Sequence, residues 1–166
     1  MTSRGPRRSV LCAEISSLLR RERRLLELLA EARAQQQSRA LHPTARVRPP
    51  DNYVLDGLLA ELRWVELERA VLVQALAGLV GLPATANLAE LARRLDPPWD
   101  EVLEEHRRGL VEVVQLVDNA DRDATLVEVP GAVLDLRLQA VLHPPARTVG
   151  GHALRSSLLD FLGETA

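Results

Sequence analysis

The 166-residue sequence contains no lysine, one cysteine and few aromatic side chains, which make up 2% of the residues. Without lysine, no enzyme chemistry through a lysine Schiff base is available. A single cysteine, Cys12, forms neither an internal disulfide nor a thiolate metal cluster. No apolar run approaches the ~20 residues that span a bilayer, and Glu14 cuts short the apolar stretch that a signal peptide would need. We therefore expect a cytoplasmic protein.

Leucine, valine and alanine supply most of the 46% hydrophobic residues, and all 21 basic residues are arginine. Leucine, alanine and arginine are strong helix formers. The net charge of −2 hides an uneven distribution, because residues 1–50 carry +7 and residues 51–166 carry −9. This size and leucine content predict one folded domain with a hydrophobic core.

Apolar residues recur at alternating spacings of four and three in three segments, which predicts three long amphipathic helices. The first series is Leu11, Ile15, Leu18, Glu22, Leu25 and Leu29; the second is Leu55, Leu58, Leu62, Val65, Arg69, Leu72, Leu76 and Leu79; the third is Trp99, Leu103, His106, Leu110, Val113 and Val117, continuing to Val141. Asp96 and Pro97 predict the start of the third helix as N-cap and first residue. Asn87 and Glu90 predict a capping box for a short helix before it.

Proline and glycine clusters set the expected boundaries, with stops at His42–Pro50, Gly81–Pro83 and His143–Pro145. The predicted fold is all-α: an elongated antiparallel bundle of three long helices plus one short helix. The helices are expected at about 9–41, 52–80, 88–95 and 97–142, within one domain at 9–145. The third long helix keeps its register across Pro130, which favours a kink over a break. Residues 1–8 are expected to be a flexible N-terminus, and 146–166 a flexible tail with the pattern of a short amphipathic helix.

Glu22 and Arg69 each interrupt an otherwise apolar series. If the first two helices fold back on each other through the linker, facing residues sum to about 93, so the two charges lie near each other. One interpretation is a semi-buried ion pair that fixes the register of the two helices. The other is that each side chain extends from the edge of the contact to solvent.

None of the four histidines has a histidine neighbour at a metal-binding helical spacing. His106 alone lies on a helical series, and we expect a neighbour such as Glu22 or a backbone carbonyl to satisfy it. Leu103 stands where a di-iron Glu-x-x-His motif needs glutamate. The sequence contains no glycine-rich motif of a phosphate-binding loop. The sequence predicts no metal, no cofactor and no enzyme, since no nucleophile partner for a catalytic histidine is recognisable.

Nucleic-acid binding is an alternative function, because arginines cluster in the N-terminal half and could contact phosphates. The clustered residues are Arg20, Arg21, Arg23 and Arg24. The same residues also fit the solvated face of a helix, and aromatic residues for base stacking are scattered. Attraction between the basic and acidic halves would need no outside partner. Nucleic-acid binding is therefore the less favoured function.

Three stretches resemble the flagellar export chaperones of the FlgN type. They are Glu66-Leu67-Glu68-Arg69, Pro98-Trp99-Asp100-Glu101-Val102-Leu103 and Val117-Asp118-Asn119-Ala120-Asp121, with Leu138 to Pro144 matching the end of the last helix. The resemblance covers most of Ile15 to Gly151. It implies a cytoplasmic type III export chaperone that binds a helical segment of hook-filament junction proteins. Such a chaperone keeps them monomeric and competent for export, and its partners are those proteins and the flagellar export apparatus.

Apolar positions of the last helix that the core does not need would receive the partner's helix. The candidate partner-binding residues are Val114, Asn119, Leu126, Val133 and Leu136. The alternative is that the same apolar residues pack on the first two helices. A structural coiled-coil adaptor that self-associates as a homo-oligomer, without a client, remains the competing function.

Overall fold

The computed structural model describes residues 4–41, 52–126 and 149–164. These residues form helices and no strand, so the predicted all-α class is confirmed for this part of the chain. The helices are α1 (Arg4–Leu41), α2 (Asn52–Val80), α3 (Leu88–Arg94), α4 (Trp99–Leu126) and α6 (Val149–Leu162). The kink predicted at Pro130, and the third helix beyond Leu126, lie outside the described residues.

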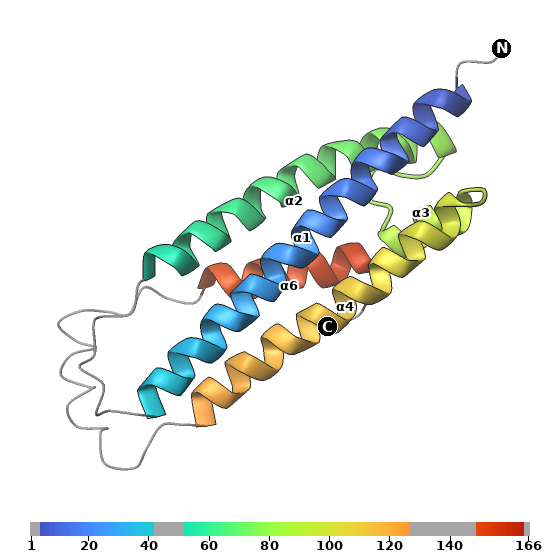
Figure 1. Ribbon diagram of the computed structural model, residues 1–166. Coiled ribbons are helices and arrows are strands. Elements are labelled where there is room, and N and C mark those ends of the chain that lie inside the picture. Colours follow the sequence, from blue (N-terminus) through green and yellow to red (C-terminus); the bar gives the residue numbers. More distant parts are fainter. Residues whose placement is uncertain (1–3, 42–51, 127–148, 165–166) are drawn as a thin grey trace.

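Helix α1 lies between α2 and α4 and packs against both of them (Figure 1). Helix α2 runs antiparallel to α1, whereas α4 runs in the same direction as α1. Helix α3 packs on α4 near the end of the bundle where α2 ends. Helix α6 lies on the side of the bundle away from the viewer, between α2 and α4, and contacts α2, α3 and α4.

The core is built from leucine and valine side chains of all five described helices. The buried apolar residues of α1 are Cys12, Ile15, Leu19, Leu25, Leu26 and Leu29. They form two adjacent rows rather than the single predicted one, because α1 has a helix on each side. Each fully buried aliphatic side chain contributes about 1.5–3 kcal/mol through removal of apolar surface from water.

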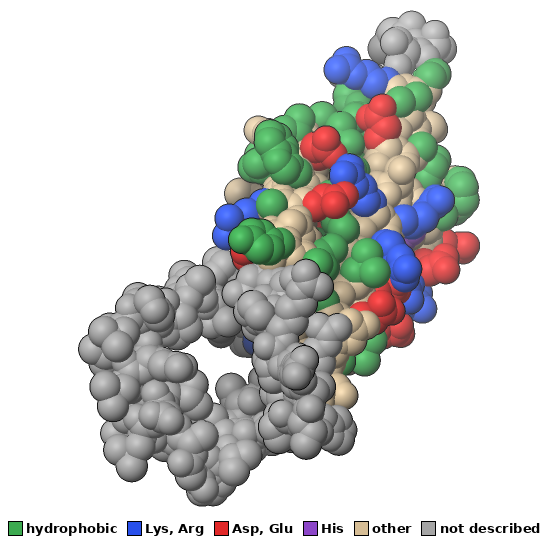
Figure 2. Space-filling view, turned by 60° about the vertical axis from the view of Figure 1, so that its left-hand side comes forward, with side chains coloured by type: hydrophobic (Ala, Val, Ile, Leu, Met, Phe, Trp, Pro, Cys, Tyr) green, Lys and Arg blue, Asp and Glu red, His purple; other side chains and the backbone are tan. Residues whose placement is uncertain are grey.

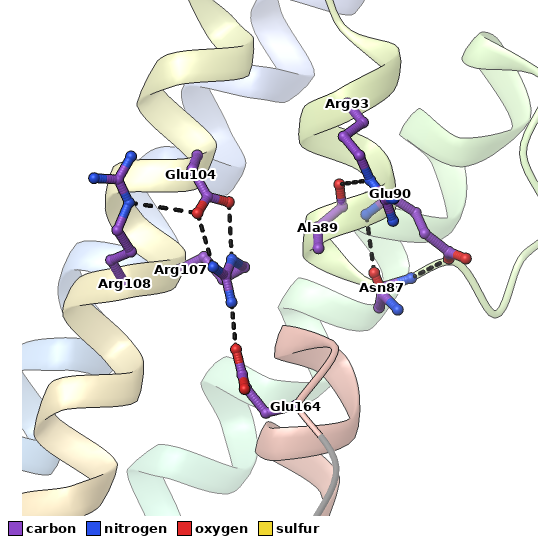
Figure 3. A network of polar contacts seen from close by, with 8 residues as sticks. All are labelled: Asn87, Ala89, Glu90, Arg93, Glu104, Arg107, Arg108 and Glu164. Carbon is purple, nitrogen blue, oxygen red and sulfur yellow. Dashed lines mark hydrogen bonds and ion pairs between the residues drawn. The ribbon is translucent and has the colours of Figure 1, made fainter.

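The predicted stop after α2 and start of α3 are both confirmed. Gly81 adopts φ of 74°, and the Leu82 N–H donates to the Ala77 carbonyl at 2.9 Å. This is the glycine-based helix end that satisfies otherwise unpaired carbonyls. At α3 the Asn87 side chain accepts from the Glu90 N–H at 2.9 Å, and the Asn87 N–H donates to the Glu90 side chain at 3.0 Å (Figure 3).

Helices α1 and α4 do not begin where the sequence predicted. Helix α1 starts at Arg4, so residues 4–8 are helical; Pro6 is tolerated because first-turn N–H groups have no partner within the helix. Helix α4 starts at Trp99, two residues later than expected, and the Trp99 N–H donates to the Asp96 carbonyl at 3.1 Å. Pro97 cannot open the helix because it precedes Pro98, and a residue before proline is driven out of the α region.

The short amphipathic helix expected in the C-terminal tail is present as α6, and it docks on the bundle instead of belonging to a flexible tail. Leu158 and Leu162 are buried. Two ion pairs hold the helix to α4: Arg155 lies 2.7 Å from Asp118, and Arg107 pairs with Glu164 (Figure 3). Four-residue spacing of the leucines predicted the helix, but the ion pairs that hold it depend on the tertiary fold.

Replacing the fully buried Leu162 with alanine tests whether α6 is part of the cooperative fold. Leu162→Ala should lower the free energy of unfolding by about 2–5 kcal/mol, since it leaves a cavity between α6 and its neighbours. Urea unfolding followed by circular dichroism measures the change. Leu67→Ala, at a side chain 60% exposed, is the control. Equal stability of the two variants would contradict the docking of α6.

Candidate helix-binding surface

Glu22 and Arg69 form a buried ion pair between α1 and α2. Arg69 Nη1 donates a hydrogen bond to Glu22 Oε1, and both side chains are only 4% exposed. The Phe161 ring of α6 covers the guanidinium, with 4.1 Å between Arg69 Cζ and the ring centroid. The structure therefore brings together the two charges that the sequence placed opposite each other, and solvent is excluded from them.

The environment of Glu22 shows why this pair is a packing feature rather than a ligand site. Burial raises the pKa of Glu22 above its usual value, and the charge and hydrogen bond of Arg69 oppose that shift. Nearby Glu66, which accepts a hydrogen bond from Ser157 of α6, raises the Glu22 pKa further. Within the described residues Glu22 Oε2 has no hydrogen-bond partner. The pair holds three helices together and is closed to ligands.

His106 is satisfied by a serine, not by Glu22 or a backbone carbonyl as expected. Its Nε2 lies 2.7 Å from the Ser16 hydroxyl, which also accepts from Arg20 at 3.1 Å. Ser16 was missed because it lies beside the predicted apolar series rather than on it. A serine and a histidine in contact are also found in hydrolases. Here Ser16 is 1% exposed, so its hydroxyl cannot reach a substrate.

The ionisation of His106 follows from the groups around it. Burial lowers the pKa of His106, and the positive charges of Arg20 and Arg23 on α1 lower it further. Glu105, on the same helix, acts in the opposite direction. No carboxylate among the described residues bonds to the second ring nitrogen in the way a catalytic triad requires. The contact links α1 to α4.

Among the candidate partner-binding residues, the structure describes the side chains of Val114 and Asn119. Val114 is 4% exposed and belongs to the core, which corrects the expectation that it is available to a partner. It packs inward because α4 has α1, α3 and α6 as neighbours. Asn119 is exposed. The side chain of Leu126, together with Val133 and Leu136, lies outside the described residues.

Helix α2 carries a second apolar series on the side away from the core. Trp64, Leu67 and Val71, which we call the outer stripe, are 67%, 60% and 66% exposed. Their spacings of three and four place them on one face of the helix. Tyr53 and Val54, at the start of α2, are exposed as well. Exposed apolar side chains in a row, unlike scattered ones, indicate a binding surface.

A shallow groove of about 510 Å³ runs beside the outer stripe, between α1 and α2. Its lining residues are Glu14, Ser17 and Leu18 of α1 and Glu68, Val71 and Leu72 of α2. Figure 2 shows hydrophobic side chains exposed beside acidic and basic ones on this side of the molecule. The groove and the outer stripe share Val71, so they form one continuous surface.

The sequence contains a signal for this surface on α2, although the spare apolar positions predicted from it lie on the last helix. Once the core series of α2 is assigned, Trp64, Leu67 and Val71 are left over at helical spacing. Their exposure could be predicted only by knowing that no other described helix packs on that face.

Comparisons with known proteins identify no relative. No protein-family model, curated protein or solved structure matches the chain. In the described part of the chain, no group of three or more histidine, cysteine, aspartate or glutamate residues could hold a metal ion. No described helix is long and apolar enough to cross a membrane. Functional inference therefore rests on the outer stripe and its groove.

Removing one member of the buried pair should be more damaging than replacing both. Glu22→Leu leaves the Arg69 charge buried and unpaired, and should lower the free energy of unfolding by about 3–5 kcal/mol. The double variant Glu22→Leu, Arg69→Met should recover most of that loss. Urea unfolding of the three proteins measures both changes. A double variant as unstable as Glu22→Leu alone would show that the charge pair is not the source of the loss.

The lowered pKa of His106 predicts a pH-dependent stability. The unfolded chain binds a proton at this histidine more readily than the folded chain, so stability should fall as the pH drops below about 6.5. Urea midpoints at about pH 7.5 and 5.5 measure the loss. His106→Gln, which retains hydrogen-bonding capacity toward Ser16 without titrating, should lose less. An equal loss in both proteins would contradict the assignment to His106.

Proposed function

We propose that the protein is an escort that binds a helical segment of an unassembled partner protein. The outer stripe of α2 is the observation that carries this proposal. An amphipathic helix recognises such a surface by placing residues at spacings of three and four against it. The groove beside the stripe, floored by the half-buried Leu18 and Leu72, gives that helix additional apolar surface to cover.

The sequence resemblance to flagellar export chaperones of the FlgN type suggests which partner this is. The proposed clients are hook-filament junction proteins, held monomeric in the cytoplasm and delivered to the flagellar export apparatus. The all-helical fold is compatible with that role. The binding surface differs from the one expected on α4, since it lies on α2.

Self-association through the same outer stripe is the competing function, as a structural adaptor or oligomerisation protein. Two exposed helical faces of this kind pair readily in coiled coils. The two functions make different demands on the surface. An escort must keep the stripe open until its partner arrives, whereas an adaptor covers the stripe in its resting state.

Nucleic-acid binding receives little support from the arginine cluster of α1. Arg21 lies 2.8 Å from Glu61, and Arg23 and Arg24 both pair with Glu27, at 3.1 and 3.3 Å. Arg20 donates to Ser16. These side chains already have partners within the chain, so binding phosphates would require breaking those contacts.

Serine substitutions in the outer stripe test the escort function. Trp64→Ser, Leu67→Ser and Val71→Ser together should abolish co-elution of the chain with a hook-filament junction protein of the same organism on size exclusion. Thermal stability should change little, since all three side chains are more than half exposed. Leu116→Ser on α4, at a residue 57% exposed, is the matched control and should retain binding.

Two results would count against this function. One is a chain that co-elutes with none of the junction proteins. The other is a triple variant that still binds as tightly as the unmodified chain. If the unmodified chain alone elutes as a dimer and the triple variant as a monomer, the outer stripe is a self-association surface and the adaptor function is correct.

A further inference from the structure

The charged groups along the groove have one predominant sign. Among the described residues, Glu14 and Glu68 are the only charged ones that line it. In the described structure Glu14 makes no ion pair, and the nearest cation to Glu68 is Arg21, at 4.0 Å. The same arginine lies closer, at 2.8 Å, to Glu61. One positive charge thus faces three carboxylates, and the surface retains two negative charges.

The carboxylates have a defined place relative to the outer stripe. Glu61 and Glu68 are seven residues apart on α2, which is about 10.5 Å along the helix axis. Trp64 and Val71 are also seven residues apart, so the acidic row runs parallel to the apolar one. Glu14 stands on the α1 side of the groove. A helix lying along the outer stripe would have an acidic edge beside it for two turns.

From this we infer that the partner segment is a basic amphipathic helix, with arginine or lysine about seven residues apart on the edge that faces Glu61 and Glu68. This inference rests on the proposed function and specifies its partner. The aliphatic stem of each basic residue covers Leu72 and Val71 while its charged end reaches a carboxylate. Charge-assisted hydrogen bonds of this kind are stronger than neutral ones.

A second copy of the chain fits the same surface less well. An antiparallel α2 pair centred on the outer stripe would set Trp64 against Val71 of a second copy. That arrangement also brings Glu68 of each copy beside Glu68 of the other copy. Like charges facing each other along a helix pair oppose association. A partner with basic residues on that edge has no such repulsion.

Two synthetic helical peptides of about 18 residues distinguish these possibilities. Both carry the same leucine series; one has arginine and the other glutamate at the two edge positions. Fluorescence anisotropy with the full chain should show about tenfold tighter binding of the arginine peptide, a preference that decreases at high salt. Glu61→Gln with Glu68→Gln should remove most of this preference. Glu101→Gln with Glu112→Gln, at exposed residues of α4, is the matched control and should not.

The outcomes separate this inference from the function on which it rests. Equal binding of both peptides, lost in the outer-stripe triple variant, would overturn the charge preference and leave the helix-binding function standing. Binding of neither peptide would overturn both. If the triple variant still binds the arginine peptide, the peptide's binding site lies outside the outer stripe, and the inference is overturned. A chain that is dimeric through the outer stripe would identify a second copy as the occupant.

Discussion

The buried contact between Glu22 and Arg69 is the constraint on which the arrangement of α1, α2 and α6 depends. Removing two charges from water is costly, and the cost is offset only when the charges meet each other in good hydrogen-bond geometry. The contact fixes how far α1 can slide along α2, because any other register leaves each charge facing leucine. Phe161 completes the enclosure from α6. A hydrophobic contact alone would accept several registers.

This constraint also explains why a short helix far along the sequence belongs to the bundle. Without α6, one side of the Arg69 guanidinium would lose its aromatic cover, and Glu66 would lose the hydroxyl of Ser157. Arg107 adds a link just beyond the C-terminal end of α6, where it bonds both Glu104 and Glu164 (Figure 3). The hydrogen bond from Arg107, together with the positive charges of Arg107 and Arg108, lowers the pKa of Glu104. Helix α6 is thus held by polar contacts at several points as well as by two buried leucines.

Sequence reasoning predicted the parts of this fold that depend on local or periodic signals. The bounds of α2 and the capping box of α3 follow from spacing along the chain. Spacing also placed Glu22 near Arg69, but it did not decide between an ion pair and two side chains that extend to solvent. Contacts between distant segments left no such signal. Ser16 contacts His106, and Asp118 pairs with Arg155. In the sequence these polar residues carry no sign that they meet, because each pair comes from segments far apart along the chain. The burial of Val114 likewise depends on the three helices that pack against α4, and the spacing of apolar residues does not predict which helices those are.

The position of the candidate surface on α2 follows from how the helices share their contacts. Helix α1 is enclosed by α2 on one side and α4 on the other, and α4 receives α3 and α6 in addition. Helix α2 has α1 and α6 as its principal neighbours, both on the side of its buried row. No described helix covers its opposite face, which carries the exposed Trp64, Leu67 and Val71. An exposed helix face normally carries polar residues, so three apolar side chains at helical spacing make this face the candidate surface for contact with another helix.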